Sequence, residues 1–201
     1  MGYSKKRILF SFGGRKMKLI MIIADYFEDT EAIATLDVLM RGNINVDLVS
    51  LMGRNKVLMK SGIEINIPLL YENINVEEYA GIIIPGGPAS FKLMPSMKSV
   101  SDLIDFFANN NKLVAAICAA PHLIGKKGYF KDKRFTVHPG FENEIIGGEY
   151  LREEGVVVDS NFITAKSMFY SVDFGLAIYE YFYGHEKMLI LKHSCMGEKS
   201  N

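Results

Sequence analysis

Long hydrophobic runs and cysteines are both scarce in this sequence. No segment approaches the ~18 uncharged apolar residues that a membrane-spanning helix needs. The chain of 201 residues has two cysteines, Cys118 and Cys195, too few for the disulfide framework of a secreted protein, and no secretory leader is evident. We therefore expect no membrane association and a reducing, cytoplasmic environment.

An excess of charge of one sign is also missing. Lys and Arg together number 23, as do Asp and Glu, so the chain has no basic footprint for nucleic acid or for an acidic membrane surface. No Cys/His pair has the spacing of a zinc site, and no glycine-rich loop matches a phosphate-binding or dinucleotide-binding motif. We expect no metal, no cofactor and no nucleic-acid partner.

The first sixteen residues differ from the rest of the chain. They are basic, contain one short apolar stretch at residues 8–12, and precede the periodic pattern that starts at Met17. Residues 13–16 read like a translated purine-rich ribosome-binding site. We predict that Met17 is the natural start, that residues 1–16 are a non-native or disordered leader, and that residues 17–201 form a single domain. The alternative is a genuine short arm or edge strand.

Apolar runs of strand length alternate with amphipathic segments along the chain. Helices are predicted at residues 30–41, 99–109, 119–125, 172–182 and 186–193. Strands are predicted at residues 18–24, 45–51, 56–59, 63–67, 81–85, 112–117, 135–138, 156–159 and 162–165, with hairpins at Ser61-Gly62 and Ser160-Asn161. This βαβ spacing predicts an α/β fold with a mostly parallel sheet and helices on both faces.

Ligands of such sheets bind beyond the carboxyl ends of the strands, where residues 25–31, 85–88 and 118–121 are expected. Residues 113–121 run from an apolar strand into small residues and a predicted helix. Cys118, at that junction, would resemble a nucleophile elbow with sulfur in place of the hydroxyl. The helix N-terminus would lower its pKa to roughly 3.5–7.5. From this segment alone, a small buried core cysteine is an equal alternative.

Three further features lie at the same strand ends. Gly86 and Gly87 follow a buried strand, where backbone amides could donate to an oxyanion; the alternative is an ordinary tight turn. Glu31 lies in the first turn of a helix, so it either caps that helix or faces Cys118, in which case repulsion from the thiolate would raise its pKa. His138 could serve as acid, base or charge partner, or be a polar loop residue. His122, one helical turn after Cys118, could flank the site or face away.

These segments together resemble the ThiJ/PfpI family, in the branch of the Parkinson-disease protein deglycase and its bacterial relatives. The matching segments are residues 24–31, 37–38, 84–87, 115–119, 136–139 and 174–184. The resemblance spans residues 17–185 and implies a flavodoxin-like three-layer sandwich and a homodimer. Family activities include cofactor-independent glyoxalase, deglycation, redox sensing and holdase chaperoning.

The resemblance also implies a role for each matching residue. Cys118 corresponds to the reactive cysteine, Glu31 to a protonated glutamate that contacts the sulfur, and His138 to a nearby histidine. The backbone amides of Gly87 and Ala119, with Gly86 beside them, correspond to the oxyanion and substrate-binding groups.

The sequence departs from the family pattern at four positions. Family peptidases have histidine where this chain has Ala119, which argues against a peptidase. Close deglycase relatives have glycine where Ala120 stands, and the extra methyl narrows the pocket. Some relatives use two arginines near the site. In this chain one of them is replaced by Lys166, and the other, which would lie near Ser61, is absent, so anion recognition should differ.

We therefore predict a cysteine-dependent, cofactor-independent glyoxalase/deglycase-like enzyme. Its substrates would be small reactive carbonyls such as methylglyoxal, or glycated groups. Two alternatives remain open. One is a redox sensor or holdase chaperone that uses oxidation of Cys118, and the other is an amidohydrolase that acts on a small substrate.

Overall fold

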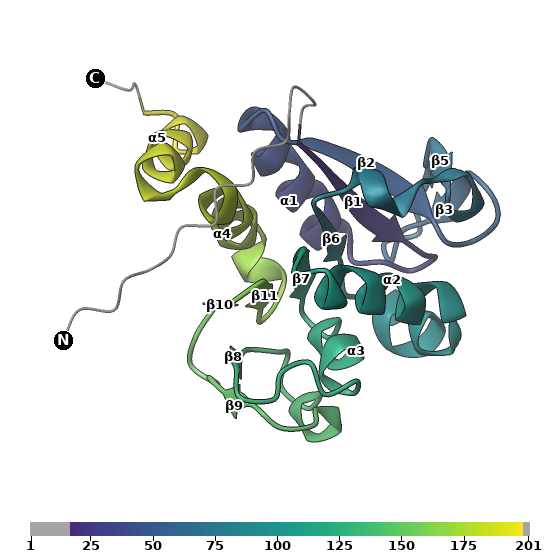
Figure 1. Ribbon diagram of the computed structural model, residues 1–201. Helices are drawn as coiled ribbons and strands as arrows, with labels where there is room; N and C mark the ends of the chain where they lie inside the picture. Colours follow the sequence, from purple (N-terminus) through teal and green to yellow (C-terminus); the bar gives the residue numbers. More distant parts are fainter. Residues whose placement is uncertain (1–16, 199–201) are drawn as a thin grey trace.

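The computed structural model describes residues 17–198, so the predicted leader lies outside the described residues. The central sheet has seven strands in the order β10-β11-β7-β6-β1-β2-β5 (Figure 1). They are β1 (Lys18–Ile23), β2 (Asn45–Ser50), β5 (Leu69–Leu70), β6 (Gly81–Ile84), β7 (Leu113–Ile117), β10 (Val156–Asp159) and β11 (Phe162–Ala165). Neighbouring strands run parallel except β10 and β11, which confirms the mostly parallel sheet and the hairpin at Ser160-Asn161.

The middle strands of the sheet are buried on both faces. From Leu19 to Ile23, the side chains of β1 are at most 1% exposed, and every residue of β7 is 0% exposed. A strand covered on both sides is apolar at every position rather than at alternate ones. This burial explains why these strands appear in the sequence as unbroken apolar runs.

Helices cover both faces of the sheet, as predicted (Figure 1). They are α1 (Asp29–Arg41), α2 (Lys98–Asn109), α3 (Pro121–Gly125), α4 (Ser171–Tyr183) and α5 (His185–Cys195). α1 packs against α4, which also contacts α5, whereas α2 packs against β6 and β7. The crossovers β1–α1–β2 and β6–α2–β7 step in opposite directions along the sheet, so right-handed connections place α1 and α2 on opposite faces. Within residues 17–198, no helix has the length and apolar character to cross a membrane.

Two small sheets accompany the main one. β3 (Lys56–Leu58) and β4 (Glu64–Asn66) form the antiparallel hairpin predicted at Ser61-Gly62. β8 (Arg134–Phe135) pairs in parallel with β9 (Glu149–Tyr150), a pair that the sequence does not predict. The predicted strand 135–138 is wrong beyond its first residue, because the next backbone amides bond elsewhere. The amide of Thr136 donates to the hydroxyl of Thr164, and that of His138 donates to the carbonyl of Cys118.

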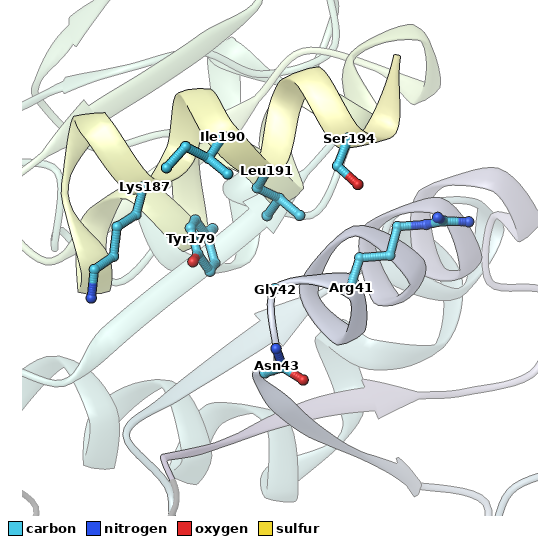
Figure 2. Close-up of a pocket in the computed structure, with 8 residues that line it drawn as sticks. All are labelled: Arg41, Gly42, Asn43, Tyr179, Lys187, Ile190, Leu191 and Ser194. Carbon is cyan, nitrogen blue, oxygen red and sulfur yellow. The ribbon is translucent and has the colours of Figure 1, made fainter. Parts of the chain in front are cut away.

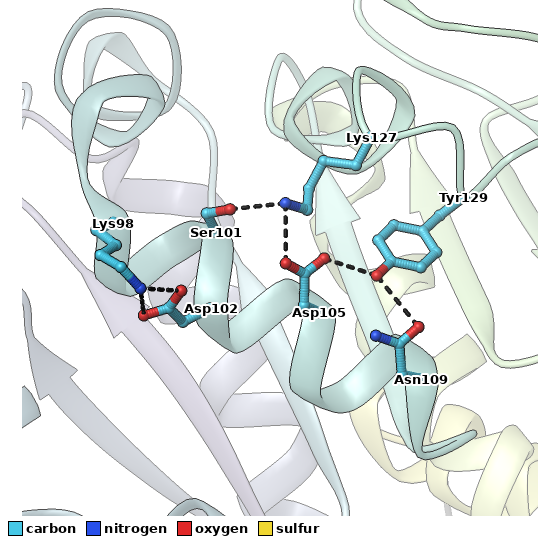
Figure 3. Close-up of polar contacts among 7 residues, drawn as sticks. All are labelled: Lys98, Ser101, Asp102, Asp105, Asn109, Lys127 and Tyr129. Atoms are coloured by element: carbon cyan, nitrogen blue, oxygen red, sulfur yellow. Dashed lines mark hydrogen bonds and ion pairs between the residues drawn. The ribbon is translucent and has the colours of Figure 1, made fainter.

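Polar contacts fasten α2 to the segment that follows α3 (Figure 3). Asp105 accepts from the Tyr129 hydroxyl at 2.6 Å and pairs with Lys127 Nζ at 3.1 Å. Lys127 also donates to Ser101 at 2.6 Å, and Tyr129 reaches Asn109 at 3.3 Å. These contacts hold the connection after α3 against α2, and α3 itself begins just beyond Cys118.

Candidate active site

Five of the six predicted site residues lie where the strand order of the sheet reverses. β2 lies on one side of β1, and β6 lies on the other. At such a switch point the loops after neighbouring strands diverge and leave a crevice beyond the carboxyl ends. The segments after β1, β6 and β7 carry Glu31, Gly86 with Gly87, and Cys118 with Ala119 to this point.

Cys118 forms a sharp turn directly after β7. Its φ of 65° lies in the left-handed region, which a non-glycine residue adopts at a cost of about 1–3 kcal/mol. The backbone is held from two sides, because the Cys118 amide donates to the Ala165 carbonyl and its own carbonyl accepts from the His138 amide, both at 2.8 Å. A sharp turn directly after β7 is the geometry expected of a nucleophile elbow.

Two backbone amides face the sulfur. The backbone amides of Gly87 and Ala119 both favour the thiolate form of the Cys118 side chain, and these are the two amides expected to bind an oxyanion. Gly87 has a φ of 77°, and a Cβ added there would lie 2.5 Å from the backbone nitrogen of Glu28. Glycine is therefore required for this close approach of the two loops. The amide of Gly86 points instead to the Glu31 carboxylate, at 2.8 Å from Oε2.

Glu31 is a buried acid beside Cys118, and a Cβ added at Gly86 would lie 2.7 Å from both its Oε2 and the Cβ of Cys118. Its side chain is 1% exposed, and interaction with the Cys118 side chain lowers its pKa against the larger effect of burial. Burial, which disfavours the charged form, raises the pKa of Glu31 to about 7. The predicted direction is correct, but the main cause is burial rather than repulsion from a thiolate. A carboxyl group with such a pKa exchanges protons readily near neutral pH.

The predicted lowering of the Cys118 pKa is wrong in direction. Burial, followed by the charge of Glu31, raises the pKa of the thiol to about 12, although the amides of Gly87 and Ala119 favour the thiolate. The expected helix N-terminus is also displaced, since α3 begins at Pro121 rather than at 119 and has five residues. The dipole effect falls off within one turn, so it cannot offset burial. The resting site holds a thiol beside a carboxyl group that titrates near neutrality.

The two histidines considered from the sequence occupy different places. His138 is exposed, and its ring Nδ1 lies 3.0 Å from the Pro139 carbonyl. Within residues 17–198 no hydrogen bond joins the His138 ring to Cys118 or Glu31. His122 is buried, and its Nδ1 lies 2.6 Å from the Ala119 carbonyl. Since a carbonyl only accepts, Nδ1 carries the proton there, and burial lowers the pKa of His122, which keeps the ring neutral.

Lys60 is a site residue that the sequence analysis missed. It lies between β3 and β4, and its Nζ pairs with Glu28 Oε2 at 2.7 Å. Its positive charge lowers the pKa of Glu31 against the larger effect of burial. Glu28 raises the pKa of Lys60, with smaller contributions from Cys118 and Glu31. No local pattern marks this lysine, because the contact joins residues 32 positions apart.

Two further observations concern residues away from Cys118. Among residues 17–198, no group of three or more His, Cys, Asp or Glu side chains is arranged to hold a metal ion. A cleft lies between the end of α1 and α5 (Figure 2). It is lined by Arg41, Gly42, Asn43, Tyr179, Lys187, Ile190, Leu191 and Ser194. It contains none of the predicted site residues.

Comparisons with known proteins identify close relatives in sequence and structure. The model of a family described as the DJ-1/PfpI family matches residues 17–181. Protein DJ-1 homolog B of Arabidopsis thaliana is 31% identical over 191 residues, which cover 94% of this chain but 43% of that protein. The chain thus spans less than half of that relative.

Other relatives match over most of their own length. A protein named deglycase from Pyrococcus horikoshii is 30% identical over 152 residues, which cover 75% of this chain and 90% of the relative. The crystal structure of Drosophila melanogaster DJ-1beta matches with a TM-score of 0.84 and 26% identity, covering 92% of this chain and 100% of that one.

Proposed function

The chain belongs to the DJ-1/PfpI family, and on that premise we propose that it is a cysteine-dependent, cofactor-independent enzyme acting on reactive carbonyls. It would convert 2-oxoaldehydes such as methylglyoxal into 2-hydroxy acids and release early carbonyl adducts from glycated groups. The observation that carries the proposal is the contact between Cys118 and Glu31, a buried acid whose pKa lies at about 7. The relative named deglycase supports action on glycated groups.

In the first step, sulfur adds to the aldehyde carbon. Because the pKa of the Cys118 thiol is raised to about 12, the thiol needs a base, and the carboxylate form of Glu31 takes its proton as the S–C bond forms. The electrons of the C=O bond move to oxygen. The resulting alkoxide faces the amides of Gly87 and Ala119, which stabilise negative charge without reorganisation.

In the second step, a proton moves between carbons. Glu31 returns the thiol proton to the alkoxide, and as a carboxylate it then removes the proton from the former aldehyde carbon. That proton is delivered to the neighbouring carbon, and the hydroxyl proton passes from the first oxygen to the second, which leaves a thioester beside an alcohol. The first carbon is thereby oxidised and the second reduced, so no external oxidant is required. Water then breaks the C–S bond of the thioester and releases the 2-hydroxy acid with the free thiol.

Two charged or titratable groups support these steps from outside. Lys60 favours the anionic forms of the site, since its positive charge already lowers the pKa of Glu31. His138, with its exposed ring, would exchange protons with solvent at the rim. We also propose the homodimer that the resemblance implies and the cytoplasmic location that the cysteine content favours, and sedimentation equilibrium would test the dimeric state.

The proposed activity is tested by measuring lactate released from methylglyoxal, with a chelator present and glutathione absent. We expect wild type and Cys195→Ser to release lactate at equal rates, because Cys195 lies on α5, away from the switch point. Cys118→Ser should lose essentially all turnover, since a serine hydroxyl is a far weaker acid than a thiol. Equal lactate from wild type and Cys118→Ser would contradict the proposal. Stepwise oxidation of Cys118 by peroxide, followed by mass spectrometry, would then test the redox-sensor alternative.

A further inference from the structure

An aromatic cluster, of which the proposed mechanism uses His138 alone, lies beside the Cys118 turn. Phe141 is its central ring, with centroids 5.4 Å from Phe91, 5.5 Å from His122 and 6.2 Å from His138. We call these four residues the aromatic cluster. Their rings are tilted or edge-on to one another, which is the favourable arrangement for aromatic pairs.

Backbone hydrogen bonds fix two members of the cluster to the nucleophile itself. The amide of His138 donates to the carbonyl of Cys118 at 2.8 Å, and the amide of Phe141 donates to the carbonyl of His138 at 3.2 Å. Two consecutive backbone hydrogen bonds therefore link Phe141 to Cys118 by way of His138.

The other two members are fixed to the residues whose amides face the sulfur. The His122 ring donates to the Ala119 carbonyl at 2.6 Å. Phe91 lies in the short helical segment Ala89–Leu93, where the amide and hydroxyl of Ser90 both donate to the carbonyl of Gly87, at 3.0 and 2.9 Å. Three separate segments, each hydrogen-bonded to the backbone at Gly87, Cys118 or Ala119, thus bring their rings together around Phe141.

Two unlike groups of side chains consequently lie around the Cys118 turn. Glu28, Glu31 and Lys60 are charged or titratable, and they come from α1 with its preceding loop and from the β3–β4 turn. The aromatic cluster is the other group, and Phe91 keeps 39% of its surface exposed. Apolar surface next to a reactive atom favours an apolar substituent on the bound molecule, because burying both surfaces removes them from water.

We propose that the aromatic cluster binds the substituent of the carbonyl substrate, and that the preferred substrates are 2-oxoaldehydes with an aryl group rather than a methyl group. As a statement about turnover, this rests on the proposed function. As a statement about binding beside Cys118, it can be tested without turnover.

The test is a competition between two alkylating ketones, 2-bromoacetophenone and bromoacetone, at equal concentrations and pH 9. In either case sulfur forms a bond to the CH2 carbon, the C–Br bond breaks, and the thiol proton goes to the buffer. Peptide mapping gives the aryl-to-methyl adduct ratio at Cys118 and at Cys195, which serves as the internal reference. A single extra methylene in an apolar pocket is worth roughly 10–200-fold. We expect the ratio at Cys118 to exceed that at Cys195 by at least ~10-fold.

Two variants separate the cluster from general surface effects. Phe91→Ala should bring the Cys118 ratio to within about threefold of the Cys195 ratio, below the roughly 10-fold gain expected for a filled apolar pocket. Phe169→Ala is the matched control, because Phe169 is 79% exposed and does not belong to the cluster. It should leave the ratio unchanged. Phe141→Leu, which keeps the core filled, gives a second reading if Phe91→Ala does not fold.

The outcomes distinguish this proposal from the proposed function. A Cys118 ratio no higher than that of Cys195, no alkylation of Cys118 by either ketone, or no effect of Phe91→Ala would overturn the role of the cluster, even in an enzyme that releases lactate. Selective aryl labelling in a protein without turnover would support the cluster and reject the enzyme. In an active protein, kcat/KM for phenylglyoxal should exceed that for methylglyoxal by at least ~10-fold in wild type, and that excess should disappear in Phe91→Ala.

Discussion

Replacing Glu31 with glutamine should change how the stability of the protein depends on pH. In the unfolded chain the carboxyl group titrates at its ordinary value of 4.5, whereas in the folded protein burial raises its pKa to about 7. The fold therefore prefers the protonated acid. Its contribution to stability is fully present below pH 4.5 and is lost as the pH rises through 7. Glutamine resembles the protonated acid in shape and has no charge to titrate.

The size of the effect follows from the two pKa values. Each pH unit between 4.5 and 7 corresponds to about 1.4 kcal/mol, so wild type should lose about 3 kcal/mol relative to Glu31→Gln across this window. Cys118, whose pKa is raised to about 12, begins to contribute only above its ordinary value of 9. Measurements that stop at pH 8 therefore isolate Glu31.

The assay is urea unfolding of both proteins at several pH values from 4.5 to 8. Taking the difference between their free energies of unfolding cancels the titration of all other groups. Glu153→Gln, at an exposed position, serves as the matched control and should follow wild type at every pH. A wild-type minus Glu31→Gln difference that stays constant over the window would refute the argument, because it would mean that Glu31 titrates alike in both states.

Two further predictions concern the loops around the sulfur. Gly87→Ala should lower the free energy of unfolding by about 1–3 kcal/mol, since φ is 77° and the new Cβ would lie 2.5 Å from the nitrogen of Glu28; an unchanged urea midpoint would contradict this. Lys60→Met should raise the pKa of Glu31 further and move the lower limb of the kcat/KM–pH profile to higher pH. Lys56→Met, on the exposed part of the same hairpin, is the control and should leave the pH dependence of kcat/KM unchanged. Identical pH profiles for the two variants would show that Lys60 does not act on the site.

The fold could be predicted from the sequence because its central strands are apolar at every position. A strand buried on both faces leaves such a run, and β1, β6 and β7 each show one. The segment after Phe135 could not be predicted correctly, because Thr136 and His138 bond to a side chain and to the Cys118 turn. These partners lie 28 and 20 positions away, and local periodicity carries no information about them.

The contact between Glu31 and Cys118 was expected from the matching strand ends and from the family resemblance, but its electrostatics were not. The pKa of a thiol depends on how deeply it is buried and on where the next helix starts. Pro121, rather than Ala119, begins α3, and burial outweighs the two amides. Lys60 was missed for a related reason, because only the folded hairpin brings it to the first turn of α1.

The left-handed backbone of Cys118 has a consequence for laboratory evolution. Glycine adopts a φ of 65° without strain, so replacing the cysteine by glycine would relieve a conformation worth about 1–3 kcal/mol. Substituting glutamine for Glu31 would likewise relieve a buried ionisable group above neutral pH. A selection for thermal stability alone would therefore favour variants that have lost the sulfur and the acid, as stability and activity trade off at strained sites. Thermostable variants of this protein should be sought with both positions held constant.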